Sequence, residues 1–462
     1  MRKHSILLWL VLIAGCASVP REQAGVGGPL GVIGVEPTHL TVDYWAGRAP
    51  RADAVVLDTS AIARQNERLK QTDRSVRDLE LMPATLSAAE VRTWIESLSS
   101  RPTRTLYDEQ GREVGGPQLD AWRTSLNLDG VASTQATRYG MVVRRADLRT
   151  FPTRTRVFSD AEDTDIDRFQ ENALFPGTPV VIAHTSRDGD WLFVVGALYS
   201  AWIEKSAVAA GDRDRILAYA HKSPYVVVTG AKTHTAYTPE RPELSSLQLE
   251  MGARVPLLPD WPIETPVNGQ HPYTAHVVEL PYRAGDGSLQ FSPALLPKTQ
   301  DIDGDYLPLT RANILRQGFK FLGERYGWGH SYDARDCSGF VSEVYRSFGV
   351  QLPRNTRDQG VSPALNRIAL SDADDHEARV KLLREAQVGD LIYIPGHVMM
   401  VIGHEHGEPY IIHDTTGINF RRGGGDIERA RLNGVSVTPL LPLLLSDGRP
   451  MIDRVYSIQR IR

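Results

Sequence analysis

Cys337 is the residue of this sequence that is best placed to act as a nucleophile. It lies in the stretch Asp336-Cys337-Ser338-Gly339, and apolar residues follow it at helical spacing, at positions 341, 344, 345 and 348. A cysteine at the start of a helix lies near unpaired backbone N–H groups and the positive end of the helix dipole, and both favour the thiolate. Most free cysteines are small buried hydrophobes, but the polar neighbours Asp336 and Ser338 argue against a dry core position. We therefore expect a reactive thiol.

Two histidines supply the partners that a cysteine nucleophile needs. His397 begins one apolar run and His413 ends the next. We expect these runs to be antiparallel strands joined by a loop over residues 403–408, which would place the histidines side by side. A thiol needs a base to take its proton, and the base needs a third group to fix its tautomer. His397 and His413 fit these two roles.

A cluster of one cysteine and two histidines can also bind zinc. The three residues here include no closely spaced pair of ligands, and His404-Glu405-His406 does not match the His-Glu-x-x-His pattern of metalloproteases. We therefore expect cysteine chemistry with no metal and no cofactor.

The N-terminus has the pattern of a bacterial export signal. Basic residues at positions 2 and 3 precede the apolar run 7–13, which is too short to span a bilayer as a stable helix. Ile13-Ala14-Gly15-Cys16 resembles a lipobox, which implies cleavage before Cys16 and lipid attachment to its sulfur. The alternative is an ordinary cleaved signal peptide. We expect a periplasm-facing protein held to the membrane by a lipid anchor at Cys16, in the outer membrane if the cell is Gram-negative.

The composition is that of a globular protein with several domains. The length of 462 residues corresponds to about three domains. The net charge is −4 at pH 7, with both signs spread along the chain and no basic stripe. Nucleic-acid binding is therefore not expected. Only two cysteines are present, so lipidation of Cys16 would leave Cys337 without an intramolecular disulfide partner.

The pattern changes repeatedly after the signal at residues 1–15. Residues 16–38 are small and Gly-rich, as in a tether. Residues 39–138 predict a mainly helical domain, with a capping box at Ser87 and Glu90. The next segments contain short strands, for example at 141–143 and 191–195. They resemble two small β-barrel SH3-like domains, over 139–210 and 211–306, the second including a Pro-rich linker. A catalytic domain is expected over 307–462.

This last domain resembles the NlpC/P60 cysteine peptidases. The motifs that carry the resemblance are Tyr326-Gly327-Trp328-Gly329, Asp336-Cys337-Ser338-Gly339-Phe340, Leu352-Pro353-Arg354-Asn355-Thr356, Val388-Gly389-Asp390-Leu391, Gly396-His397-Val398 and Ile412-His413. The resemblance implies an α+β, papain-like catalytic domain. It also implies Cys337 as nucleophile, His397 as base and His413 as the residue that orients the base.

The resemblance further implies residues that surround the substrate. Tyr326 would lie at the oxyanion site, and Asp336 would bind a free amino terminus. Ser338 and the loop Arg354-Asn355-Thr356 would face the α-carboxylate of D-Glu, and Trp328 would also line the site. The sequence departs from the family pattern at His330, where many members have glycine, and at Thr356, where some have serine. These departures leave the floor of the substrate site undefined.

The expected function is cleavage of the γ-D-glutamyl-diamino acid bond in murein peptides, with preference for a free N-terminal L-Ala. Its partners would be peptidoglycan peptides, with diaminopimelate or lysine at the third position. The alternatives are an endopeptidase that acts on intact peptidoglycan stems and a non-catalytic SH3-type wall-binding lipoprotein. Asp336 discriminates between the first two, because only a free L-Ala ammonium could pair with it. Asp is also a common helix cap, which would be a purely structural role.

Overall fold

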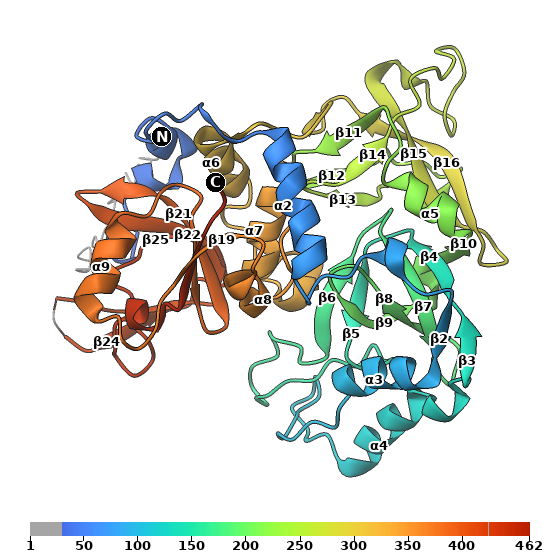
Figure 1. Ribbon diagram of the computed structural model, residues 1–462, viewed down its shortest axis with the longest axis horizontal. Coiled ribbons are helices and arrows are strands. Elements are labelled where there is room, and N and C mark those ends of the chain that lie inside the picture. Colours follow the sequence, from blue (N-terminus) through green and yellow to red (C-terminus); the bar gives the residue numbers. More distant parts are fainter. Residues whose placement is uncertain (1–29, 424) are drawn as a thin grey trace, which may run out of the picture.

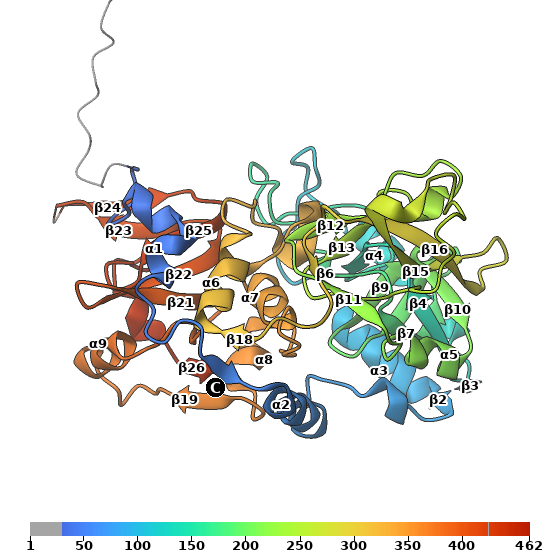
Figure 2. The same cartoon turned by 90° about the horizontal axis from the view of Figure 1, so that it is seen from above.

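The computed structural model of the protein describes residues 30–423 and 425–462. The expected lipidation site, Cys16, lies outside the described residues. The chain forms two lobes, one built on the C-terminal sheet and the other on two β domains (Figures 1 and 2). Within the described part of the chain, no helix is long and apolar enough to cross a membrane.

The C-terminal lobe is built on an antiparallel sheet of six strands. In spatial order these are β19 (Asn366–Ala369), β26 (Ser457–Arg460), β20 (Leu391–Ile394), β21 (His397–Glu405), β22 (Glu408–Thr415) and β25 (Gly434–Pro439). One face is covered by α6 (Arg311–Phe319), α7 (Cys337–Arg346) and α8 (Thr356–Val361), and the other by α9 (His376–Arg384) (Figure 1). A hairpin of β23 (Ile418–Arg421) and β24 (Ile427–Ala430) extends from the sheet. The lobe is α+β, as the sequence predicts.

Local signals position α7 and its first residue, Cys337. Asp336 is the N-cap, and its carboxylate accepts the backbone N–H of Gly339 at 2.8 Å. Phe340, Val341 and Val344 are fully buried and share a core with Val398, Met400 and Ile412 of the sheet. The predicted helix is therefore confirmed, with Cys337 in its first turn.

The two histidine strands form an antiparallel hairpin, as predicted, but its loop is shorter than expected. Strand β21 continues to Glu405 through an irregularity between Val401 and Gly403, and β22 begins at Glu408. The connection is the pair His406 and Gly407, which have φ angles of 51° and 80°. Positive φ at both central residues is typical of a type I′ turn, which matches the strand twist.

The predicted helical domain over residues 39–138 is wrong as a unit, because its two halves pack on different lobes. Helices α1 (Val42–Ala46) and α2 (Thr59–Thr72) lie on the C-terminal lobe, where β1 (Val55–Leu57) pairs with β18 (Leu309–Thr310). Trp45 and Ile62 belong to the same core as α7. Helices α3 (Ala88–Leu98) and α4 (Gly116–Ser125), with β2 (Thr85–Ser87) and β3 (Thr134–Ala136), pack on the first β domain. Each half completes the core of its neighbour.

The first β domain is a seven-stranded sheet. Its spatial order is β10 (Val208–Gly211), β4 (Arg138–Val142), β7 (Pro179–Thr185), β8 (Trp191–Val195), β9 (Ser200–Glu204), β5 (Ala146–Arg149) and β6 (Gln170–Leu174). The strands predicted at 141–143 and 191–195 correspond to β4 and β8. Strand β6 lies next to the segment Trp328–Asp333 of the C-terminal lobe, so this domain borders the expected substrate site.

The second β domain follows α5 (Arg213–Tyr219) and consists of three small antiparallel sheets. They are β14 (Arg254–Pro256) with β11 (Tyr225–Val228) and β17 (Ile302–Asp303), β12 (Lys232–His234) with β13 (Gln248–Glu250), and β15 (Ala275–Arg283) with β16 (Leu289–Pro297). The Pro-rich segment after β14 leads into this last hairpin. Glu250, at the end of β13, is fully buried and faces the C-terminal lobe, where it pairs with Arg335.

Candidate active site

The thiol of Cys337 lies at the start of α7 in a nearly dry position. The residue is 4% exposed, so the expectation that its polar neighbours keep it out of the core is wrong. Burial, followed by the charge of Asp336, raises the pKa of the thiol to about 12, despite the helix N-terminus. Sγ lies 3.7 Å from Oγ1 of Thr356. The resting nucleophile is therefore a thiol rather than a thiolate.

The predicted pairing of His397 with His413 is present. Nε2 of His397 lies 2.9 Å from Nδ1 of His413, and Nε2 of His413 lies 3.1 Å from Oγ1 of Thr438. Nδ1 of His397 has no hydrogen-bond partner in residues 30–423 and 425–462, so it is free to accept a proton. Burial lowers the pKa of His397 to about 4, so the imidazole is neutral at pH 7. Thr438 extends the predicted pair to a chain of three and has no sequence motif that marks it.

Two groups can stabilise an oxyanion next to Sγ. The backbone N–H of Cys337 occupies the first helical position, where no acceptor from the helix itself is available. Tyr326 is held beside the nucleophile segment by a bridge to Arg335. Burial is the main cause that raises the pKa of its phenol, which therefore stays a donor. Its hydroxyl group makes no hydrogen bond with the described residues and is free for a ligand.

Asp336 is already neutralised, which argues against its expected role as the receptor of a substrate ammonium. Its Oδ2 accepts the guanidinium of Arg354 at 2.7 Å and the backbone N–H of Gly329 at 3.1 Å. Its Oδ1 accepts Ser338 Oγ at 3.0 Å as well as the helix N–H. Arg354 is the largest of the influences that hold the pKa of this carboxyl far below its usual range against burial. Asp336 thus caps the helix and binds Arg354.

The other predicted substrate residues surround this ion pair. Ser338 Oγ accepts Arg354 Nη1 at 2.8 Å, so both belong to one network. Trp328 is partly exposed and donates its indole N–H to the carbonyl of Gln170 in the first β domain, at 3.0 Å. Asn355 is exposed and donates to Asp358 at 2.9 Å. The structure therefore brings Ser338, Arg354 and Thr356 close to Cys337, whereas Trp328 lies against the first β domain and Asn355 is exposed.

His330, the departure from the family pattern, is a buried bridge rather than part of an open floor. Its Nδ1 lies 3.0 Å from Arg354 Nη2, and its Nε2 lies 3.5 Å from Glu343. Its φ of 66° is left-handed, and a Cβ added at Gly339 would lie 2.5 Å from its ring. Burial lowers its pKa to about 4, so the ring is neutral. His330 thus connects the guanidinium of Arg354 to Glu343 of α7.

Two residues of the first β domain complete the site and were not identified from the sequence. Tyr199 donates its hydroxyl to Glu171 at 2.5 Å, and Thr150 donates to the other oxygen of Glu171. Burial and Glu171 raise the pKa of Tyr199, which also responds to the charges of Arg354 and Asp336. Glu171 therefore has neutral donors and no ion-pair partner in the described part of the chain. The contact between Tyr199 and Glu171 joins two segments that lie 28 residues apart, so no local sequence motif marks it.

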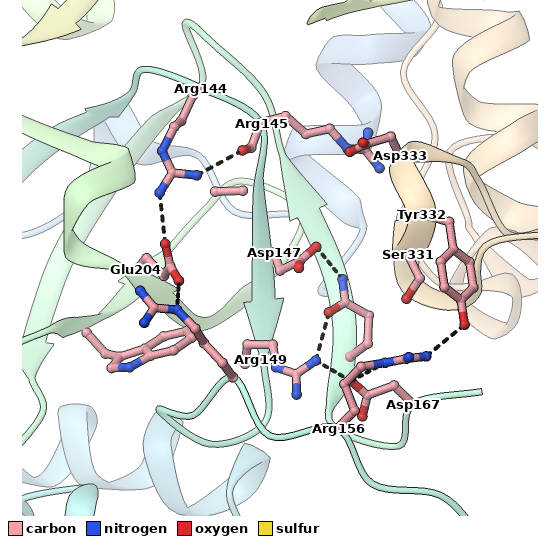
Figure 3. Close-up of a pocket in the computed structure, with 14 residues that line it drawn as sticks. Arg144, Arg145, Asp147, Arg149, Arg156, Asp167, Glu204, Ser331, Tyr332 and Asp333 are labelled. Carbon is pink, nitrogen blue, oxygen red and sulfur yellow. Dashed lines mark hydrogen bonds and ion pairs between the residues drawn. The ribbon is translucent and has the colours of Figure 1, made fainter. Parts of the chain in front are cut away.

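A separate pocket of about 450 Å³ lies between β5 and the loop at residues 331–333 (Figure 3). Five arginines line it, and each is paired with a carboxylate. Arg144 and Arg154 pair with Glu204, Arg145 with Glu250 and Asp333, Arg149 with Asp167, and Arg156 with Glu109. Of these pairs, the one between Arg145 and Asp333 joins the two lobes. Within residues 30–423 and 425–462, no cluster of three His, Cys, Asp or Glu side chains is arranged to hold a metal.

Comparisons with known proteins agree with this geometry. Residues 323–435 match the NlpC/P60 family and residues 156–204 match an SH3 domain of the SH3b1 type. A curated relative, the gamma-D-glutamyl-L-lysine dipeptidyl-peptidase of Bacillus cereus, is 26% identical over 263 residues, 52% of this chain. The chain spans 66% of that relative's length.

A solved structure has a similar fold. It is an NlpC/P60 endopeptidase from Photobacterium damselae subsp. piscicida, with a TM-score of 0.73 and 17% identity. The match covers 90% of this chain and 96% of that one. The likeness therefore includes both lobes as well as the catalytic sheet.

Proposed function

This chain contains an NlpC/P60 family domain and an SH3 domain of the SH3b1 type, and from this premise we propose that it is a peptidoglycan-directed cysteine peptidase. The bond that it cleaves would be the one between γ-D-Glu and the diamino acid of murein peptides. The observation that carries the proposal is the hydrogen-bonded chain from His397 through His413 to Thr438, in the lobe whose helix α7 begins at Cys337. Wall binding alone would need neither the thiol nor this chain.

The reaction would start from a neutral thiol and a neutral imidazole. Sγ attacks the γ-carbonyl carbon while the thiol proton moves to Nδ1 of His397, and the carbonyl electrons become an oxyanion. The N–H of Cys337 and the hydroxyl of Tyr326 donate to this oxygen. The C–N bond then breaks, and His397 returns the proton to the leaving amine. Water, deprotonated by His397, finally hydrolyses the thioester and restores the thiol.

The orientation of the base follows from its neighbours. For Nδ1 of His397 to accept a proton, Nε2 must carry the hydrogen and donate to Nδ1 of His413. His413 then donates from Nε2 to Thr438. This arrangement stabilises the imidazolium that forms during attack.

Glu171 supports preference for a peptide with a free amino terminus. Glu171 has no cationic partner among the described residues, whereas Asp336 is paired with Arg354. An L-Ala ammonium would pair with Glu171 next to the Tyr199 hydroxyl. A peptide still linked to the glycan has an amide there and would leave the carboxylate unpaired, which is costly.

The test compares L-Ala-γ-D-Glu-meso-diaminopimelate with its N-acetylated form by mass spectrometry of the products. The wild type should cleave the free peptide between D-Glu and the diamino acid. Cys337→Ser should cleave neither while keeping its thermal melt. Glu171→Gln should lose about tenfold or more in kcat/KM on the free peptide only. Equal rates on both peptides would favour action on intact wall, and activity in Cys337→Ser would exclude the peptidase proposal.

We also propose that Cys16 is lipidated and holds the enzyme to a membrane facing the periplasm. The support is the sequence Ile13-Ala14-Gly15-Cys16 after an apolar run. In a bacterial host the protein should fractionate with membranes, and Cys16→Ala should move it to the soluble fraction. Soluble wild-type protein would indicate an ordinary signal peptide.

A further inference from the structure

A second pocket, of about 360 Å³, opens beside the catalytic centre and is lined by unpaired arginines. Its walls come from the segment after α2, from α3, from the β8–β9 connection and from the start of α8. Arg74, Arg77, Trp94, Tyr199, Asn355 and Asp358 are among the lining residues. It therefore lies where the first β domain meets the C-terminal lobe.

Arg77 is a half-buried cation without a counterion. In the described part of the chain its guanidinium forms no ion pair or hydrogen bond, and its Nη1 is buried without a partner. The face of Trp94 lies 4.9 Å from its guanidinium carbon. Burial lowers its pKa. A buried charge without a partner is costly, so this arrangement favours an anionic ligand.

The nearby charges leave the pocket positive. Arg74, at the rim, also forms no ion pair with the described residues. Asp358 is the one acid in the lining, and its carboxylate accepts the amide of Asn355 at 2.9 Å. Glu90 lies near enough to act on Arg77, but it is held by Ser87 in the cap of α3. Two arginines thus face the cavity against one engaged carboxylate.

The pocket of Figure 3 is the contrasting case within the same molecule. There each arginine already faces a carboxylate of the chain. A planar guanidinium with free N–H groups matches the two oxygens of a carboxylate. Arg77 and Arg74 have guanidinium N–H groups that are not paired with a carboxylate of the described residues, whereas those of the arginines in Figure 3 are already paired.

Two residues connect the pocket to the catalytic centre. Tyr199 lines the pocket and donates to Glu171 in the substrate site. Asn355 lines it as well and directly precedes Thr356, whose hydroxyl lies 3.7 Å from Sγ of Cys337. The pocket therefore borders the surroundings of Cys337 through Tyr199 and Asn355.

We propose that this pocket is a carboxylate-binding subsite, in which Arg77, assisted by Arg74, binds an acidic group of the peptide held at Cys337. This inference rests on the proposed peptidase function. Murein peptides offer three carboxylates of this kind: the α-carboxylate of D-Glu, that of the diamino acid, and that of a terminal D-Ala. All three share the chemistry that a guanidinium recognises.

The first test uses steady-state kinetics on L-Ala-γ-D-Glu-meso-diaminopimelate-D-Ala. Arg77→Gln removes the charge and keeps most of the side-chain length, and it should raise KM about tenfold or more while kcat changes little. Arg154→Gln is the matched control, because Arg154 is an exposed arginine already paired with Glu204, and it should leave KM unchanged. An unchanged KM in Arg77→Gln would overturn the subsite.

Three peptides, each amidated at one carboxylate, identify the group that binds. For the bound group, amidation should raise KM in the wild type and have little further effect in Arg77→Gln, because the interaction is already lost. If amidation effects are the same in both proteins at all three positions, the subsite is excluded.

A binding measurement separates this inference from the peptidase proposal. If the wild type cleaves none of the peptides, the proposed function fails. Isothermal titration calorimetry with the tetrapeptide then tests whether the subsite still binds a carboxylate. Binding that is about tenfold weaker in Arg77→Gln would uphold it. Equal affinity in both proteins, or no binding to either, would overturn it.

Discussion

At the scale of single residues, the ionisation of Cys337 and His397 is governed by burial rather than by the helix dipole. The thiol pKa is raised to about 12 and the imidazole pKa is lowered to about 4. Both shifts favour the neutral forms, because desolvation penalises charge whatever its sign. The helix N-terminus favours the anion by a smaller amount. Proton transfer must therefore accompany attack rather than precede it.

This neutral pair predicts an unusual pH–rate profile. His397 accepts a proton only when neutral, so kcat/KM should fall about tenfold per pH unit below its pKa of about 4. The rate should stay level between about pH 5 and 7, because the thiol does not ionise there and the L-Ala amine of the substrate, whose usual pKa is about 8, stays protonated. A stopped assay across this range, with enzyme stability checked at each pH, measures it. An acidic limb near pH 6.5 would contradict the prediction.

The residues that we propose as catalytic could be recognised in the sequence because each lies in a short motif with its own local signal. Cys337 begins an amphipathic helix, and each histidine marks one end of an apolar run. Glu171, Tyr199 and Thr438 have no such signal. Their roles arise from contacts between segments distant in sequence, such as the 2.5 Å bond from Tyr199 to Glu171. The motif around Asp336 does not reveal that Arg354, 18 positions later, pairs with its carboxylate.

At the scale of elements, the start of α7 combines a helix cap with a buried ion pair. Asp336 and Arg354 are both buried, and the pair also fixes the loop before α8 through Ser338. Breaking a buried pair by removing one partner commonly costs about 3–5 kcal/mol. Loss of a capping side chain costs about 1 kcal/mol. Loss of the ion pair with Arg354 should therefore destabilise the protein more than loss of the cap.

Two substitutions at Asp336 separate these contributions. Asp336→Asn keeps a good cap and removes the charge, whereas Asp336→Ala removes both. Both variants should show a clearly lower Tm and a large loss of activity, with Asp336→Ala the less stable by about 1 kcal/mol. Thermal and denaturant unfolding measure this order. A nearly normal Tm in Asp336→Asn would show that the pair with Arg354 contributes little.

Elements with a strong local pattern were predictable, and those that depend on long-range partners were not. Strands β4 and β8 and helices α3 and α7 follow from apolar periodicity and caps. The division of residues 39–138 between two lobes depends on where Trp45 and Trp122 are buried, and these tryptophans belong to different cores. A helical pattern indicates that a helix forms, but it does not identify the surface on which it packs.

At the scale of the whole molecule, one buried carboxylate joins three parts of the chain. Glu250 belongs to the second β domain and is fully buried. It binds Arg335, two residues before the nucleophile, and Arg145 of the first β domain, the latter at 2.6 Å. Arg335 also pairs with Glu343 of α7 at 2.8 Å and with Glu324 at 3.0 Å. The β domains are thereby fixed against the catalytic centre.

This junction predicts that Glu250→Gln weakens the enzyme without touching the reacting atoms. The variant leaves Arg145 and Arg335 short of one counter-charge in a dry site, where breaking such a pair costs about 3–5 kcal/mol. Glu171 and Tyr199 would then be held less firmly against Cys337, so KM should rise more than kcat falls. Hydrogen exchange should increase in β6, β13 and the 328–334 segment together. Glu279→Gln is the control, since Glu279 pairs with the partly exposed Lys222 in the same lobe, outside the junction, and such a pair should contribute less than a fully buried one. If both variants match the wild type in Tm, KM and exchange, Glu250 has no part in positioning the lobes.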